Sequence, residues 1–220
     1  MENRLTARSI AGIGLVLVAV LSLATVAVAG PGGKGKGKGK NKPPATTAAT
    51  TTTDAPPTSS ANQADADFVR MMIPHHHQAL VMSRLAPDRT GNAEVLALAG
   101  RIDVEQTIEI ATMQRWQVFN GFDETESETA YAMMMQNPEM LEMMGMATEA
   151  ELDQLDTLSG SAFDQLFLQL MIDHHQGAVD MCVVVMTNGQ DPVLQSMANE
   201  MLTTQSTQIF QMQTMLTDIG

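Results

Sequence analysis

An internal repeat constrains the fold of this 220-residue chain more than any other feature of its sequence. His75-His76 recurs as His174-His175, and the offset that joins them pairs further residues without a gap. The other pairs at this offset include Phe68 and Phe167, Met72 and Met171, Ala79 and Ala178, Met82 and Met181, Gln106 and Gln205, and Met113 and Met212. Chance identity would not keep one register over so long a stretch. The chain therefore contains two copies of one structural unit.

Each copy has the pattern of a helical hairpin. Apolar residues recur at spacings of three and four, and few segments show the alternation typical of strands. Asn92 and Asp191-Pro192 are helix-start signals at matching places in the two copies. The predicted helices span about 63–86, 92–119, 160–187 and 191–218. The sequence thus predicts an all-α fold, a four-helix bundle made of two repeated hairpins joined by a crossover.

Two local signals refine this prediction. Thr148-Glu149-Ala150-Glu151 is a capping-box pattern, which predicts one more short helix in the crossover. Pro74 falls inside the first predicted helix, so we expect a kink or a new segment there. Because Asp173 stands at the equivalent place in the second copy, the repeated unit does not require proline.

The N-terminus has the pattern of an export signal. Arg4 and Arg8 precede an uncharged apolar run from Ile10 to about Val26, and Ala27-Val28-Ala29 offers a small-x-small cleavage pattern. We predict a signal peptide at 1–29, with an uncleaved membrane anchor as the alternative. Either one exports the remainder of the chain, so we expect a secreted, periplasmic or cell-surface protein.

Composition divides the exported part into a linker and a domain. Residues 30–61 are low-complexity sequence, first Gly/Lys-rich and then Thr/Pro-rich, with almost no large apolar side chain. The predicted domain spans 62–220, with repeat one at about 62–119, the crossover at 120–158 and repeat two at about 159–220. A passive tether is the favoured interpretation of this linker, and contact of its five lysines, Lys34 to Lys42, with an anionic cell surface is the alternative.

The domain is strongly acidic. From Ala61 onward five arginines stand against 23 Asp and Glu residues, a net charge of −18. This balance argues against a nucleic-acid partner, because phosphate binding needs positive charge. An acidic surface also raises the local concentration of cations, although solubility alone accounts for it as well.

The repeated histidines stand among methionines at helical spacing. Residues four and seven apart share a helix face, so His75 lines up with Met71 and Met82, and His174 with Met181. His76 lies beside Met72, His175 lies beside Met171, and Met113 and Met212 of the second helices can face the same layer. The predicted metal ligands are His75, His76, Met72, Met82, Met113, His174, His175, Met171, Met181 and Met212. For any single methionine, core packing is the alternative.

Ligand softness selects the metal. Thioether with imidazole favours Cu(I), with Ag(I) as a surrogate, whereas hard cations prefer oxygen ligands. Glu105 and Glu109 could join a mixed centre, but the second copy has Thr204 and Gln208 at those positions. A di-iron centre of the ferritin type is therefore disfavoured.

A second group of residues is a weaker set of candidates. Four crossover methionines resemble the flexible thioether clusters that suit Cu(I) in oxidising compartments, with adaptable apolar surface as an equal alternative. Cys182 is the single cysteine, so no intramolecular disulfide can form, and a small buried side chain is its favoured role. These weaker candidates are His77, Met140, Met143, Met144, Met146 and Cys182.

Three blocks of the chain resemble a known family. They are MMIPHHHQALVM, RIDVEQTIEIATMQRW and MMGMATEAELDQLDTLSGSAFDQLFLQLMIDHHQGAVDM, and they resemble the domain of unknown function 305 family over roughly residues 62–220. The resemblance implies an exported, ferritin-like four-helix protein with two His-His half-motifs, and some members are similar to copper-binding resistance proteins that use His and Met. Its motif residues fall on His75, His76, Met82, Gln106, Met113, His174, His175, Met181, Gln205 and Met212. This chain departs from the motif at two positions. His77 is an extra histidine where the second copy has Gln176, and Cys182 stands where the motif usually has alanine.

These observations favour an exported protein that sequesters or passes on copper, as Cu(I), without catalysing a reaction. One alternative is a redox enzyme with a mixed metal centre, in which Glu105 and Glu109 join His75 or His76. The other is a metal-free structural or surface-interaction module in which histidine and methionine only pack.

Overall fold

A computed structural model of the chain describes residues 60–219, which lie within one compact unit. The predicted signal peptide (1–29) and nearly all of the predicted linker (30–61) lie outside these residues. Within 60–219 the secondary structure is helical and contains no strand, which confirms the all-α prediction.

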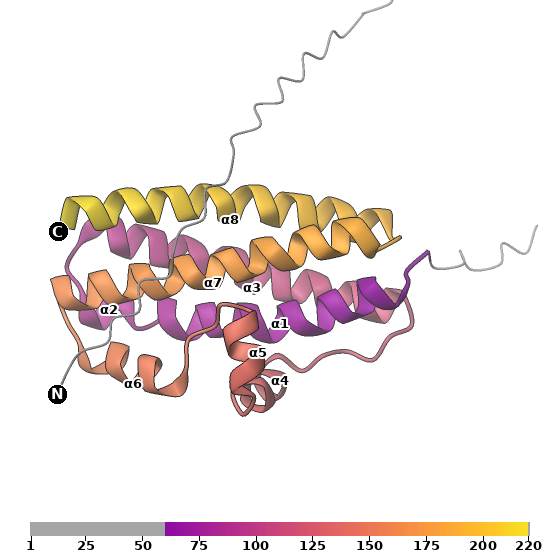
Figure 1. Cartoon of the computed structure of the whole chain (residues 1–220), viewed down its shortest axis with the longest axis horizontal. Helices are drawn as coiled ribbons and strands as arrows, with labels where there is room; N and C mark the ends of the chain where they lie inside the picture. Colours follow the sequence, from indigo (N-terminus) through magenta and orange to yellow (C-terminus); the bar gives the residue numbers. More distant parts are fainter. Residues whose placement is uncertain (1–59, 220) are drawn as a thin grey trace, which may run out of the picture. The chain divides into compact units, whose positions relative to one another are not determined.

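Four long helices run side by side in this part of the chain (Figure 1). They are α1 (Gln63–Ser83), α3 (Ala93–Phe119), α7 (Ser161–Asn188) and α8 (Pro192–Ile219). The most extensive contacts are between α7 and α8 and between α1 and α3, so each repeat forms one hairpin. The two hairpins meet mainly where α1 packs against α7.

Side chains cap these helices where the sequence predicts helix starts. Asn92 accepts hydrogen bonds from the backbone N–H groups of Glu94 and Val95, and Asp191 accepts one from Leu194 at 2.9 Å. Helix α1 ends at Ser83, and a short helix, α2 (Ala86–Arg89), follows it. The predicted single helix to residue 86 is therefore two pieces. Pro74 lies buried inside α1, and the helix continues on both sides of it.

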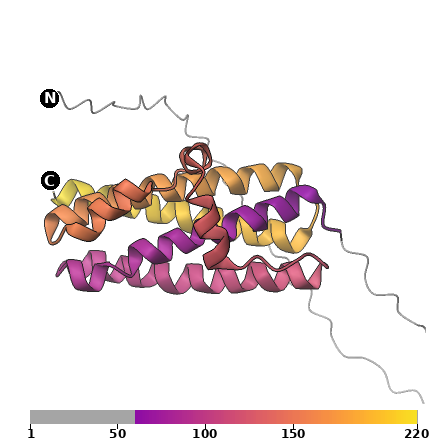
Figure 2. The ribbon, with the colours of Figure 1, turned by 90° about the horizontal axis from the view of Figure 1, so that it is seen from below.

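The crossover contains three short helices. They are α4 (Ser127–Met134), α5 (Pro138–Met143) and α6 (Glu149–Thr157), and they lie against the side of the bundle formed by α1 and α7 (Figure 2). The capping box of Thr148 and Glu151 opens α6 as predicted. The sequence prediction missed α4 and α5. Asn137 followed by Pro138 is a helix-start signal for α5, because the Asn137 side chain accepts from Met140 N.

The buried side chains of the long helices form two apolar clusters. The first apolar cluster includes Met82, Leu98, Phe163, Phe167 and Met212. The second apolar cluster includes Phe68, Met72, Met113, Trp116 and Ala198. Each of the four long helices contributes to both clusters, so one cluster fills each half of the bundle.

Membrane insertion of these helices finds no support. None of the helices within residues 60–219 combines the length and the apolar character needed to cross a bilayer.

Candidate metal site

A layer of polar side chains separates the two apolar clusters. On α7, Met171 of the first cluster and Ala178 of the second cluster flank His174-His175. On α1 the histidines His75-His76 lie between Ile73 of the second cluster and Ala79 of the first, and on α3 and α8 buried glutamines lie between members of the two clusters. We define the polar layer as His75, His76, Gln106, His174, His175, Gln205 and Gln208, all of which are buried. The sequence repeat thus places two matching sets of polar residues halfway along the bundle.

The four repeated histidines form one compact group, which we call the histidine row, and the two copies meet where His75 lies against His174. The ring centroids of His75 and His174 are 3.7 Å apart, with 30° between the ring planes. The ring centroids of His76 and His75 are 6.2 Å apart, and those of His175 and His174 are 6.1 Å apart. All four side chains have no solvent exposure. The structure therefore brings together all four histidines that the sequence pairs.

Backbone carbonyls fix the protonation of the two central rings. His75 Nε2 lies 3.1 Å from the Met144 carbonyl oxygen, and His174 Nε2 lies 2.9 Å from the His75 carbonyl oxygen. A carbonyl oxygen can only accept, so both Nε2 atoms carry the proton. In the neutral ring the lone pair is then on Nδ1.

The outer rings are oriented by side chains of α3 and α8. His175 Nε2 lies 2.8 Å from Gln208 Oε1, and Gln208 Nε2 donates to Glu105 at 2.7 Å. In the first copy His76 Nε2 lies 2.8 Å from a Glu109 carboxylate oxygen. Metal-binding histidines commonly donate their second ring N–H to such an acceptor. Glu105 and Glu109 therefore act here as partners that orient the polar layer.

The Nδ1 atoms of the row have no hydrogen-bond partner within residues 60–219. All four are buried, and so are the unpartnered Oε1 of Gln106 and both amide atoms of Gln205. A buried polar group without a partner costs roughly 1–3 kcal/mol, so native structures seldom leave several together. The polar layer thus has several unused lone pairs in one place.

Burial keeps three of the four imidazoles neutral. Burial is the largest cause that lowers the pKa of His75 to about 3, and the neighbouring His76 is the next cause. Burial also lowers the pKa of His175 to about 4, against a smaller opposing effect of the Gln208 hydrogen bond. The pKa of His174 lies well below its usual value for the same reason, with His75 as the next cause. A neutral imidazole is the form that binds a metal ion.

Five of the six predicted methionine ligands lie in the apolar clusters. Met72 and Met113 belong to the second apolar cluster, and Met82, Met171 and Met212 belong to the first, all without solvent exposure. The sixth, Met181, is half-buried and contacts the crossover methionines. Among residues 60–219, no group of three or more His, Cys, Asp or Glu side chains is arranged to hold a metal ion. The histidine row therefore needs rearrangement or other donors to complete a coordination shell.

The weaker candidates lie outside the polar layer. His77 is half-buried, contacts Ser127 Oγ through Nδ1 at 2.8 Å, and stacks on Tyr131 with centroids 4.9 Å apart. Cys182 is buried in the second apolar cluster, where burial raises the pKa of its thiol to about 12. A thiol in that environment stays protonated at neutral pH.

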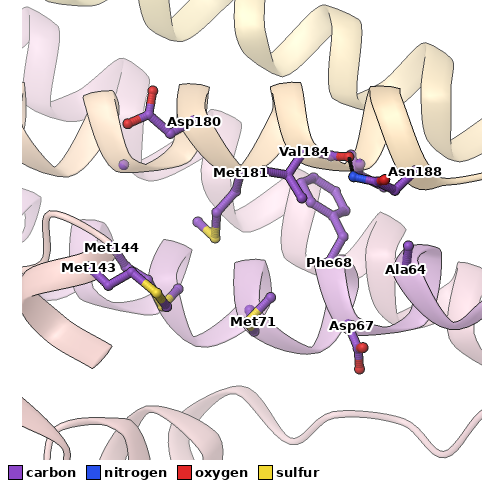
Figure 3. Close-up of a pocket in the computed structure, with 12 residues that line it drawn as sticks. Ala64, Asp67, Phe68, Met71, Met143, Met144, Asp180, Met181, Val184 and Asn188 are labelled. Carbon is purple, nitrogen blue, oxygen red and sulfur yellow. Dashed lines mark hydrogen bonds between the residues drawn. The ribbon is translucent and has the colours of Figure 1, made fainter. Parts of the chain in front are cut away.

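Crossover methionines form one wall of an open groove. Met144 and Met146 are buried with Leu141 in a small third cluster, Met140 is half-buried against it, and Met143 is 67% exposed. Beside them lies a cavity of about 450 Å³ between α1, α5 and α7 (Figure 3). We call it the methionine groove, because its lining includes Met71, Met143, Met144 and Met181. The repeat does not single out Met71, whose matching residue is Leu170.

An all-α bundle with a duplicated, buried histidine layer defines the class of protein. The chain belongs to the DUF305 family, a domain of unknown function, whose model matches residues 65–216. Among curated protein sequences none matches this chain significantly.

Solved structures of the same family resemble the chain over most of their length. A DUF305 protein from Streptomyces coelicolor, named as a candidate secreted protein, is 33% identical with a TM-score of 0.62, over 71% of this chain and 94% of that one. A DUF305 fragment from Deinococcus radiodurans is 32% identical with a TM-score of 0.64, over 72% and 98%.

A third similar structure is that of a copper-bound protein. CopM in its Cu(II)-bound form is 31% identical with a TM-score of 0.59, over 70% of this chain and 96% of CopM. CopM has also been solved in Cu(I)-bound and Ag-bound forms, which match at 28% identity with TM-scores of 0.57 and 0.52. The copper and silver ions in these structures are bound by CopM.

Proposed function

We propose that this protein is an exported copper-binding protein that sequesters copper or passes it on. Copper is its cargo, and the chain catalyses no reaction on it. The observation that carries the proposal is the row of His75, His76, His174 and His175, whose buried Nδ1 atoms have no hydrogen-bond partner among residues 60–219. Copper as Cu(I) is the favoured form, with Ag(I) as its surrogate.

The chemistry of the row supports a soft or borderline cation. The imidazoles of His75, His174 and His175 are neutral. The Nε2 atoms of all four rings lie against acceptors, and the ring atoms without a partner within 60–219 are the Nδ1 atoms. A metal ion would satisfy lone pairs that no protein group within 60–219 satisfies. The similarity to CopM, crystallised with Cu(I), Cu(II) and Ag, supports copper as the cargo.

Export and the acidic surface fit this role. The predicted signal peptide at 1–29 supports export, as does the similarity to the Streptomyces coelicolor protein. A net charge of −18 from Ala61 onward attracts cations to the domain. Contact of Lys34 to Lys42 with an anionic surface remains a proposal about the linker.

Anaerobic titration of the purified, tag-free protein with Cu(I), in competition with a chromophoric chelator, tests the proposal. We expect binding by the wild-type chain to weaken strongly in a variant with His75, His76, His174 and His175 all replaced by alanine. A second variant with glutamine at all four positions keeps a donor near each Nε2 position and removes each Nδ1 lone pair.

His77→Gln is the matched control, because His77 lies outside the row. Helicity measured by circular dichroism checks that each variant is folded. Equal Cu(I) affinity in the wild type and in the folded glutamine variant would refute the role of the row. No copper binding and no rise in melting temperature with Cu(I) would instead favour the metal-free structural module.

A redox centre is the second candidate function. The contact between His76 and Glu109 favours it, because imidazole with carboxylate suits iron or manganese. Metal analysis after expression without added copper separates the two candidates. Iron or manganese bound together with oxidase or peroxidase activity would support the redox enzyme.

A further inference from the structure

We propose that the methionine groove is a second metal site, which binds one monovalent soft cation, Cu(I) or Ag(I), through thioether sulfurs alone. Its ligands are drawn from Met71, Met143, Met144 and Met181. The inference deepens the proposed metal binding and rests on it, and because its ligands are thioethers and not imidazoles the two sites can be tested separately.

The four thioethers reach the groove from three helical segments. Met71 lies on α1, Met181 on α7, and Met143 and Met144 at the end of α5. In Figure 3 the Met181 side chain projects from α7 toward α1, while Met143 and Met144 enter the same space from the crossover. Methionine supplies four of the twelve lining residues, against 19 of 220 in the whole chain. Met144, Met71 and Met181 also pack in or against the third cluster, and all four methionines line the groove.

Burial differs among the four methionines in a way that suits uptake from solvent. Met144 is 1% exposed, Met71 and Met181 are half-buried, and Met143 is 67% exposed. A cation arriving from water thus meets the Met143 sulfur first, and the buried wall of the groove stands behind it. Asp67 and Asp180 also line the groove and add negative charge. Each carboxylate has a partner, Arg70 for Asp67 and Gln176 for Asp180, and a soft monovalent cation prefers thioether sulfur to carboxylate oxygen.

The crossover holds Met144 in place through its backbone. The Met144 carbonyl accepts from His75 Nε2, and the next residue, Gly145, has a φ of 66°. Gly177 on α7 lets the crossover touch the helix backbone, since a Cβ there would collide with the Met144 carbonyl. The backbone at Met144 is therefore held against both α1 and α7.

Ligand chemistry selects the oxidation state. Thioethers are neutral, polarizable donors that favour Cu(I) and Ag(I), whereas Cu(II) prefers nitrogen and oxygen. The remaining lining is largely apolar, with Phe68, Val184 and Val185, so few protein oxygens compete. A small apolar ligand is the competing occupant of such a groove. Binding of an apolar dye, compared with binding of Ag(I), distinguishes the two.

The test compares Ag(I) binding by the full chain and by Met71→Leu/Met181→Leu. Leucine keeps the volume and removes the sulfur, and Leu170 already stands at the position that matches Met71. Native mass spectrometry counts the bound Ag(I), and X-ray absorption identifies sulfur or nitrogen ligands. We expect the double variant to lose one Ag(I) per chain together with the sulfur-only signal.

Met201→Leu/Met215→Leu is the matched control. Both control residues are buried methionines of the apolar clusters, and neither is a candidate ligand of either metal site. This control and the glutamine variant of the histidine row should both keep the sulfur-only Ag(I). Unchanged Ag(I) binding in the groove variant overturns the inference, and so does an apolar dye that binds the groove while Ag(I) does not.

The two proposals fail in different ways. A wild-type chain that binds neither Cu(I) nor Ag(I) refutes the proposed function and this site with it. If the groove variant keeps every bound Ag(I) while the histidine variant loses one, only the groove site is refuted. If the groove variant loses one Ag(I) while the histidine variant keeps every bound Ag(I), the groove site is supported and the role of the histidine row is refuted.

Discussion

At the scale of single residues, the tautomers of the central histidines follow from their neighbours. The Met144 and His75 carbonyls occupy Nε2 of His75 and His174, which leaves Nδ1 unpartnered inside the bundle. The same carbonyl contact ties His75 to the crossover. One buried ring therefore links the polar layer with the methionine groove.

Protonation of the buried histidines should make the metal-free fold sensitive to acid. Burial lowers the folded pKa of His175 to about 4 from an ordinary value of 6.5, so between these values only the unfolded chain binds the proton. The free energy of unfolding should fall as the pH drops from 6.5 toward 4, by about 1.4 kcal/mol per pH unit for each such histidine. Urea denaturation in the presence of a chelator measures this slope.

His175→Gln should lose one histidine's share of that slope. Glutamine can still hydrogen-bond Gln208, and the carboxylates that titrate at low pH are the same in both proteins. If the wild type and the variant show the same dependence between pH 6.5 and 5, burial of neutral His175 is not what makes the fold sensitive to acid.

At the scale of elements, the crossover is fastened to the bundle at repeat-equivalent positions. Gln78 is fully buried and exchanges two hydrogen bonds with the backbone of Ala147, at 2.8 and 2.7 Å. Its counterpart Gly177 allows direct contact between α7 and the crossover. The two copies of the repeat thus differ at this position. The first copy binds the crossover through the Gln78 side chain, and the second has a glycine that allows close backbone contact.

Gly177→Ala should displace the crossover from α7. The added Cβ meets the Met144 carbonyl, and relief of that overlap requires backbone movement, at a cost of roughly 1–3 kcal/mol. We expect a lower midpoint of urea denaturation and weaker Ag(I) binding at the methionine groove. Gly100→Ala is the control, since nothing lies within 4 Å of its added Cβ and alanine favours α3. Equal stability losses at both positions would refute the close approach.

At the scale of the whole domain, the repeat made most of the architecture predictable. One offset placed the four long helices and matched His75 with His174, and the packing of α1 against α7 brings this pair together. The placement of Met72 and Met171 was harder to predict. Helical spacing puts them beside histidines, but three-dimensional packing assigns them to the apolar clusters.

The groove was not predictable from the repeat, since the crossover has no second copy. Met71 and Met181 become neighbours of Met143 and Met144 only when the crossover folds back over α1 and α7. The φ of Gly145 and the close contact at Gly177 produce that path, and neither has a distinctive sequence pattern. The repeat in the sequence therefore predicts the polar layer, which both copies build. It does not predict the methionine groove, which depends on the unrepeated crossover.

Anomalous diffraction from crystals soaked with Cu(I) or Ag(I) tests the central claim, copper binding by the duplicated histidine layer, most directly. The account predicts a peak beside Nδ1 atoms of the His75, His76, His174 and His175 row. A separate peak among the groove sulfurs is expected from the further inference. Well-diffracting soaked crystals with no peak in the polar layer, or with peaks only at surface carboxylates, would contradict the account.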